Sequence, residues 1–241
     1  MFRTPSTLSR NLHTQIAERI GTSIIRGEIA PGEPLPSEMR ICNMLAVSRT
    51  AVREAIRILT GKGLVESRAK SGTRVRAPEL WHYFDPDVLR WQLSGTDIDT
   101  FLAKLFSLRM ALEPSAAALA AGAANADAKS RLRAAWEAMA CAESSEAYVT
   151  ADIAFHVTIY TATGNEFFWS VAQMFEVALR RSFTLAAPGE HRPRSLAEHR
   201  AVMEAISACD AAGAREATAV LMQHSADDIV RILGHNPFAG E

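Results

Sequence analysis

Apolar residues in the first part of the chain recur with a helical period. Four of them fall four positions apart: Leu12, Ile16, Ile20 and Ile24. This spacing places them on one face and predicts a helix over residues 8–26. The next segment, GEIAPGEPLP at 27–36, is rich in Gly and Pro, which interrupt regular structure. The helix is therefore expected to end before this segment.

Two shorter helices are predicted after this break. Ser37 and Ser48 each stand directly before a stretch with helical pattern, at 38–46 and 49–63. A Ser hydroxyl at this position accepts a hydrogen bond from a backbone N–H group that the first turn of a helix leaves unpaired. The short interval between the two helices indicates a tight turn.

A β-hairpin is predicted next, over residues 64–77. Two short, partly alternating runs flank a turn at Lys70, Ser71 and Gly72, which is a hairpin pattern. Three helices followed by a hairpin predict a winged helix-turn-helix.

The remainder of the chain has an almost wholly helical pattern. Residues 80–96 contain several aromatic side chains together with Pro86 and Gly95, and we interpret them as a connector that packs against its neighbours. Residues 97–236 predict about six helices and no strand, a compact bundle. The expected fold is mainly α: a winged helix-turn-helix at 1–79, a connector at 80–96 and an all-helical bundle at 97–236.

Composition narrows the class of protein. The chain has 241 residues, of which 48% are hydrophobic, which is ample for a packed core. No apolar run approaches the ~18 residues of a membrane-spanning helix, and the N-terminus has no signal-peptide pattern, so we expect a cytoplasmic protein with no membrane partner. The three cysteines, at 42, 141 and 209, are too far apart to suggest disulfides or a thiolate zinc site.

Charge is distributed unevenly. Residues 1–79 carry 13 Lys and Arg against 7 Asp and Glu, a net charge of +6, whereas the rest carries 13 against 20, a net charge of −7. A basic N-terminal part indicates a polyanion as its partner, and the acidic remainder argues against nucleic acid along the whole molecule.

The second capped helix has a basic outer face. Its apolar stripe turns Arg49, Thr50 and Arg53 outward. A solvated charged face is the alternative for an isolated helix of this kind, but the capped helix before it and the basic hairpin after it favour a helix that reads the major groove of DNA.

The N-terminal part resembles the GntR family of bacterial transcription regulators. The resemblance rests on IIRGEIAPGEPLPSE, LAVSRTAVREAIRILTGKGLVE and SGTRV, within residues 12–76. One departure is Met39, which stands where family members often carry Arg, with Arg40 one position later. The resemblance implies that the following residues contact DNA: Ser37, Arg40, Ser48, Arg49, Thr50, Arg53, Lys70, Ser71 and Gly72.

Polar residues interrupt the apolar faces of the C-terminal helices. Asp152 and His156 are four positions apart on a face shared with Phe155 and Ile159, and His199 lies on a similar stripe. A buried carboxylate or imidazole is costly unless it is hydrogen-bonded or binds a cation. Two interpretations stay open: a hydrogen-bonded Asp–His core, or a site for a divalent metal such as zinc, nickel or manganese. His224 is a less clearly oriented fourth candidate.

Arg109 also falls on an apolar stripe. An inward guanidinium requires an anion, which Glu113 or an acidic ligand could supply.

The C-terminal part resembles the ligand-binding domain (FCD type) of the FadR subfamily of GntR regulators. The carrying stretches are SLRMALEPSAAALAA, ADIAFHVTIYTATGN and LAEHRAVMEAI. The resemblance implies a metal held by Asp152, His156, His199 and His224, with zinc as the first choice. It also implies an effector site at Arg109, Asp152, His156 and His199. The connector stretch YFDPDVLRWQL is similar to repressors of galactonate catabolism, which implies a sugar acid as effector.

These observations predict a homodimeric transcription regulator that binds a palindromic operator and is released by a small hydroxy acid. A single helix-turn-helix reads few base pairs, and a two-fold protein matches a palindrome. Alternatives are an effector such as lactate, gluconate or a uronate, a pure metal sensor, and a helical metalloenzyme. We do not expect the protein to be an enzyme, because the sequence shows no obvious set of general acid and base residues beyond the metal ligands.

Overall fold

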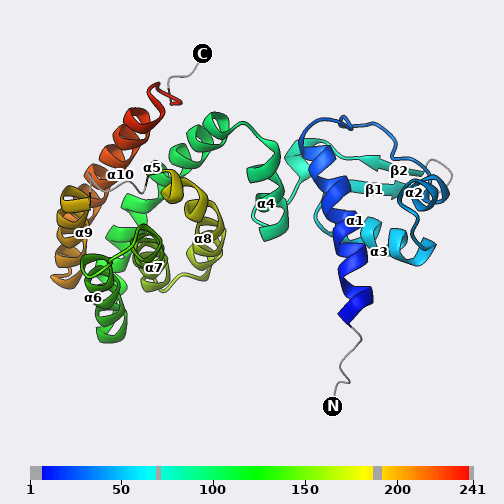
Figure 1. Cartoon of the computed structure of the whole chain (residues 1–241). Coiled ribbons are helices and arrows are strands. Elements are labelled where there is room, and N and C mark those ends of the chain that lie inside the picture. The colour runs from blue at the N-terminus through cyan, green and yellow to red at the C-terminus, as the bar shows by residue number, and fades with distance from the viewer. Residues whose placement is uncertain (1–6, 69–71, 187–191, 239–241) are drawn as a thin grey trace. The chain divides into compact units, whose positions relative to one another are not determined.

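The computed structural model describes residues 7–68, 72–186 and 192–238. The chain divides into two compact units, residues 1–96 and 97–241, and Figure 1 shows their elements. The first unit has the following elements: α1 (Thr7–Ile25), α2 (Glu38–Leu45), α3 (Arg49–Gly61), β1 (Val65–Arg68), β2 (Gly72–Val75), the 3-10 helix η1 (Pro78–Leu80) and α4 (Pro86–Gly95). The predicted winged helix-turn-helix is confirmed.

The helix-turn-helix is formed by local backbone chemistry. Ser37 caps α2 by accepting a hydrogen bond from the backbone N–H of Arg40, and Ser48 caps α3 in the same way through Ala51. Between the helices Ala46 adopts φ 53°, a left-handed conformation that lets the chain reverse. The tight turn and both caps agree with the sequence pattern.

The wing has a third short pairing that the pattern did not predict. β1 and β2 are antiparallel, with Val65 opposite Val75. Pro34, in the segment before α2, forms an isolated antiparallel bridge with Arg74, and Arg74 donates a hydrogen bond to the carbonyl of Gly32 at 2.9 Å. The Gly- and Pro-rich segment is thereby attached to the wing. Lys70 and Ser71, predicted at the turn, lie outside the described residues.

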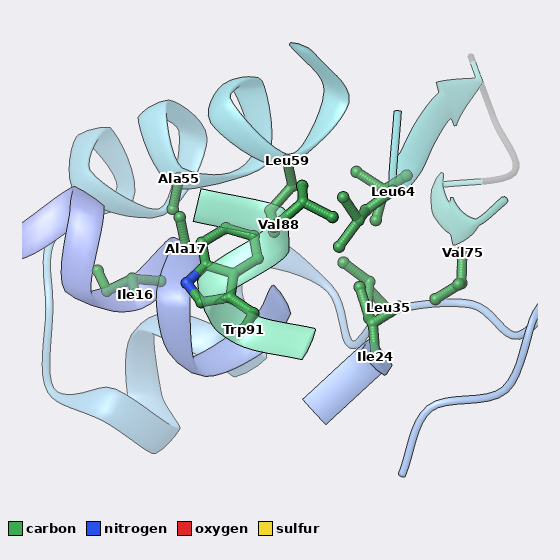
Figure 2. Packing of buried hydrophobic residues seen from close by; sticks show 11 residues of the cluster. Ile16, Ala17, Ile24, Leu35, Ala55, Leu59, Leu64, Val75, Val88 and Trp91 are labelled. Atoms are coloured by element: carbon green, nitrogen blue, oxygen red, sulfur yellow. The ribbon is translucent and has the colours of Figure 1, made fainter. Parts of the chain in front are cut away.

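The connector contains a helix, α4, that the pattern missed. Asp85 caps it and Pro86 stands at its first position, a favourable helix start. Trp91 on α4 is buried in the core of the first unit, and Figure 2 shows its indole beside Ala17 and Ala55. Residues 86–95 therefore belong structurally to the first unit.

Gly21 on α1 is expected to tolerate no side chain. A Cβ atom there would lie 2.4 Å from the ring of Trp91, which is buried in this core. Gly21→Ala should therefore destabilise the first unit by about 1–3 kcal/mol, although Ala normally favours a helix by ~1 kcal/mol. Urea unfolding measures this. Gly122→Ala is the control, because Gly122 is helical, exposed and without neighbours within 4 Å; equal effects of both changes would contradict the packing explanation.

Six helices form the second unit over the residues that the structure describes, as the pattern predicted. They are α5 (Ile98–Ala123), α6 (Ala126–Ala140), α7 (Ser145–Ala162), α8 (Glu166–Ala186), α9 (Arg192–Ser207) and α10 (Ala211–Leu233). α7 packs against α5, α6 and α8, and α9 packs against α5, α6 and α10. Buried faces of α5, α7 and α9 therefore enclose a shared interior.

Among the described residues, no helix has the length and apolar character needed to cross a membrane.

Candidate metal centre and DNA-reading surface

Three of the predicted metal ligands converge in the interior of the second unit. Asp152 and His156 lie one turn apart on α7, and His199 comes from α9. Their ligand atoms all lie within 4.8 Å of one another, and all three residues are buried. Asp152 Oδ1 lies 2.9 Å from His199 Nε2 and 3.3 Å from His156 Nε2. The helical spacing that predicted one face has thus placed a carboxylate between two imidazoles.

Both imidazoles are oriented through their second nitrogen. His199 Nδ1 donates a hydrogen bond to the backbone carbonyl of Ser195 at 2.7 Å. His156 Nδ1 lies 2.7 Å from the carboxylate atom Glu113 Oε2. A proton on Nδ1 leaves the Nε2 lone pair of a neutral imidazole available, which is how metal-binding histidines are normally prepared.

The donor set fits a divalent metal ion. Two atoms bound to one ion at 2.0–2.2 Å in tetrahedral or octahedral geometry lie roughly 3 Å apart, and the separations from Asp152 Oδ1 to the two Nε2 atoms agree with this. Two imidazole nitrogens and one carboxylate suit zinc, nickel or manganese. Asp152, His156 and His199 can therefore hold such an ion.

Charge inside this cluster is balanced by pairing. Burial alone would raise the pKa of Glu113, but the charges of Arg109 and His156 outweigh it and lower that pKa to about 2. Burial would likewise raise the pKa of Asp152, but His199 and His156 outweigh this effect and lower that pKa. Burial opposes a charged His156, but Glu113 and Asp152 raise its pKa to about 9. Protons and a metal ion therefore compete for the same site.

The effect of pH on stability should differ between the metal-free and the metal-loaded protein. The raised pKa of His156 adds stability that is complete below its ordinary value of 6.5 and is lost as pH rises through about 9. The metal-free protein should therefore lose up to about 3 kcal/mol between these values. Metal affinity should rise over the same interval by about tenfold per pH unit, because binding releases one proton. In excess metal this gain offsets the loss, so the stability of the metal-loaded protein should change little over the interval. Thermal unfolding of both forms across this interval measures this; parallel slopes would contradict it.

Arg109 is paired with a protein carboxylate. Its Nε donates a hydrogen bond to Glu113 Oε1 at 2.6 Å, its side chain is 0% exposed, and its guanidinium lies 4.9 Å from the centre of the Phe106 ring. Of the two alternatives for its anion, the structure contains the Arg–Glu pair. Contact with an effector stays a prediction for Arg109.

The structure does not bring His224 into the group of three. His224 on α10 is partly exposed, and its Nδ1 lies 2.5 Å from Glu198 Oε1. Glu198 also approaches Arg194, which pairs with Asp228. A fourth ligand at His224 stays a prediction and would require this pairing to change.

Sequence reasoning missed the residues that orient the two histidines. The sequence pattern links Glu113 only to Arg109 and gives no signal for Ser195. Ser195 stands four positions before His199, so its carbonyl lies within reach of His199 along the helix. The contact between Glu113 and His156 joins two helices that are distant in sequence and had no local signal.

The predicted DNA-reading residues lie on an exposed surface of the first unit. Arg49, Thr50 and Arg53 are exposed on α3, and Arg40 is exposed on α2. Ser37, Ser48 and Gly72 are also exposed, and the two capping hydroxyls can still donate their own O–H. Arg53 donates a hydrogen bond to Glu38 at 2.9 Å while its side chain stays 68% exposed. A solvated pair of this kind contributes little stability and can exchange for a DNA contact.

Comparison with known proteins identifies the family of the chain. Residues 12–75 match the model of bacterial regulatory proteins of the gntR family, and residues 104–224 match the FCD domain. The chain belongs to the GntR regulators with an FCD domain. Its relatives and both domains are those of transcription regulators, so the chain is a regulator and not an enzyme.

Two Escherichia coli proteins match this GntR regulator over nearly their whole length. The uncharacterized HTH-type transcriptional regulator YieP is 32% identical over 217 residues, 89% of this chain and 94% of that protein. The galactonate operon transcriptional repressor is 28% identical over 221 residues, 90% and 96% of the two chains.

Solved structures support the same fold. The Listeria monocytogenes protein Lar aligns with a TM-score of 0.61 at 19% identity, covering 95% of this chain and 99% of that one. A GntR protein of Streptococcus agalactiae aligns with a TM-score of 0.50 at 25% identity, covering 88% and 97%.

Proposed function

We propose that this GntR regulator is a metal-containing repressor of a sugar-acid catabolic operon, with an acid of the galactonate type as its effector. The observation that carries the proposal is the buried group of Asp152, His156 and His199, whose Nε2 and carboxylate atoms converge inside the FCD domain. The similarity to the galactonate operon repressor supports the choice of acid.

The metal would supply a Lewis-acid position for an oxygen of the acid. Zinc is the first choice, with nickel or manganese as alternatives. Asp152, His156 and His199 would hold it, and Glu113 and Ser195 would keep the two histidines in the metal-binding orientation. A carboxylate and a neighbouring hydroxyl of the acid would then be recognised at one place.

A ligand screen followed by operator-binding assays tests the proposal. Thermal shifts are measured on metal-loaded protein with galactonate, gluconate, glucuronate, lactate and acetate, because a ligand of the native state raises the unfolding temperature by mass action. Operator affinity is then measured with each acid. We expect a sugar acid to give the largest shift and to weaken operator binding at least tenfold, which requires only about 1.4 kcal/mol of coupling. A tight-binding acid that leaves operator affinity unchanged would contradict the proposal.

Two alternatives are distinguished by the same experiments. A regulator that answers another carboxylate, such as lactate, would show its largest shift with that acid. A metal sensor would change its operator affinity on metal titration alone, without any acid. The second alternative is worth testing because Asp152, His156 and His199 already converge without an acid.

We further propose that the protein acts as a cytoplasmic homodimer on a palindromic operator. One α3 helix reads few base pairs, and two copies related by a two-fold axis read two half-sites. The basic N-terminal unit would lie on the DNA, and α4, the last element before residue 97, is our candidate for passing the effector signal between the units.

Arg53→Ala is expected to weaken operator binding by about 1–3 kcal/mol if Arg53 contacts a base edge. Only the exposed pair with Glu38 is lost from the free protein, so stability should change by less than about 1 kcal/mol. Fluorescence anisotropy at a fixed salt concentration measures the affinity.

Arg57→Ala is the matched control for Arg53. It removes the same charge from α3, and its side chain is 80% exposed and paired only locally, with Glu54. The expected loss is clearly smaller than for Arg53. Equal losses would indicate general attraction to phosphate, and an unchanged affinity of Arg53→Ala would show that Arg53 does not read the operator.

A further inference from the structure

Tyr160 has a buried hydroxyl with no hydrogen-bond partner among the residues that the structure describes. The residue is 1% exposed, on α7, and its Oη atom makes no hydrogen bond there. Leaving a buried polar group unpaired costs about 1–3 kcal/mol, and such groups are uncommon in native proteins. We therefore expect the hydroxyl to form a hydrogen bond with a group other than the described residues.

The position of Tyr160 relates it to the candidate metal centre. It follows His156 by four residues, as His156 follows Asp152, so the three side chains form one stripe on α7. After burial, the charges of Glu113 and Arg109 are the influences on the pKa of its hydroxyl, and Glu113 is the carboxylate that lies 2.7 Å from His156 Nδ1. Long side chains of a helix lean toward the preceding turn, here the turn of His156.

The ring of Tyr160 is held by aromatic packing. Its centre lies 5.5 Å from that of Phe175 and 6.1 Å from that of Phe168, both on α8. Burial raises the pKa of the phenol above its ordinary value, so the hydroxyl stays protonated and can donate to an anion or to a sugar hydroxyl. A fixed ring with a protonated hydroxyl is well suited to selecting among ligands.

We propose that Tyr160 is a specificity-determining residue of the effector site, where its hydroxyl hydrogen-bonds an oxygen of the acid beyond the carboxylate and the 2-hydroxyl. This inference rests on the proposed function. The metal can take the two oxygens that all 2-hydroxy acids share, so a third polar contact selects acids with further hydroxyl groups. A polyhydroxy acid meets this requirement, whereas lactate has no hydroxyl beyond position 2.

Tyr160→Phe tests the assignment, because it removes the hydroxyl and keeps the ring. Affinities of metal-loaded wild type and variant for galactonate, gluconate and lactate are measured by calorimetry. We expect the variant to bind the better of the two sugar acids about tenfold more weakly, which corresponds to about 1.4 kcal/mol, and lactate with less than a twofold change. Metal content and fold should be unchanged.

Tyr148→Phe is the matched comparison for stability. The Tyr148 hydroxyl on α7 is hydrogen-bonded to Ser195 Oγ at 2.9 Å, so its removal should lower the unfolding temperature, whereas removal of the Tyr160 hydroxyl without acid should leave it unchanged or raise it. A fall in the unfolding temperature of acid-free Tyr160→Phe would show that the hydroxyl has a structural partner, such as a buried water, and would overturn the assignment.

The outcomes separate this inference from the proposed function. If wild type and Tyr160→Phe bind the sugar acid equally, the inference is wrong and the proposed function stands. Equal losses of affinity for the sugar acid and lactate would mean that Tyr160 contacts the carboxylate or the 2-hydroxyl, which both acids share. That result would overturn its role in selectivity. If wild type binds none of the three acids, the proposed function and the inference are both wrong.

Discussion

Asp152→Asn is expected to lower metal affinity by more than about 100-fold. Asp152 Oδ1 lies within 3.3 Å of both His156 Nε2 and His199 Nε2, so this one atom is central to the donor set. Replacing a residue that only hydrogen-bonds to a metal ligand typically lowers metal affinity about 10- to 100-fold. Loss of a charged ligand itself should lower it more. Elemental analysis of protein purified without chelator or metal-affinity tag, followed by metal titration, measures the change.

Asp127→Asn is the control for this change. Asp127 on α6 is 75% exposed and pairs with Arg131, so its replacement removes one carboxylate without touching the cluster. The control should keep wild-type metal content, and the double variant Asp152→Ala, His156→Ala should contain none. Stoichiometric metal in Asp152→Asn would refute the assignment. A wild-type protein that neither contains nor takes up metal would favour the hydrogen-bonded Asp–His core instead.

Local patterns predicted the parts of the site that lie within single helices. Asp152 and His156 were placed on one buried face because four residues make about one helical turn, and both are buried there. The same reasoning applied to His199. His224 was ambiguous in the pattern because apolar residues surround it on more than one side, and the structure pairs it with Glu198.

Contacts between distant elements had no comparable signal. Glu113 contacts His156 because α5 and α7 pack together, and no local spacing encodes that pairing. α4 was missed because it lies in a short segment that also contains Pro, Gly and several aromatic residues, although Asp85 and Pro86 form a recognisable helix start. The pairing of Pro34 with the wing likewise depends on tertiary contact.

Glu113→Leu is expected to destabilise the protein by about 3–5 kcal/mol. The carboxylate is buried between Arg109 and His156, at 2.6 and 2.7 Å, and its loss leaves a buried guanidinium without this counter-charge. Urea unfolding measures the effect. Glu204→Leu is the control, because Arg200 and Glu204 have the same helical spacing but are 60% and 58% exposed, and exposed pairs contribute about 0–1 kcal/mol.

The double variant Arg109→Met, Glu113→Leu separates the two roles of Glu113. Replacing both members of a buried ion pair by apolar side chains is often neutral or stabilising, so most of the lost stability should return. The orientation of His156 should not return, because its Nδ1 would still lack the carboxylate, and metal affinity should stay about 10- to 100-fold below wild type. Recovery of stability together with full metal affinity would mean that Glu113 serves only to neutralise Arg109. Recovery of stability alone would establish two roles. Arg109 keeps the Glu113 carboxylate ionised and in place, and Glu113 in turn orients His156 to bind the metal.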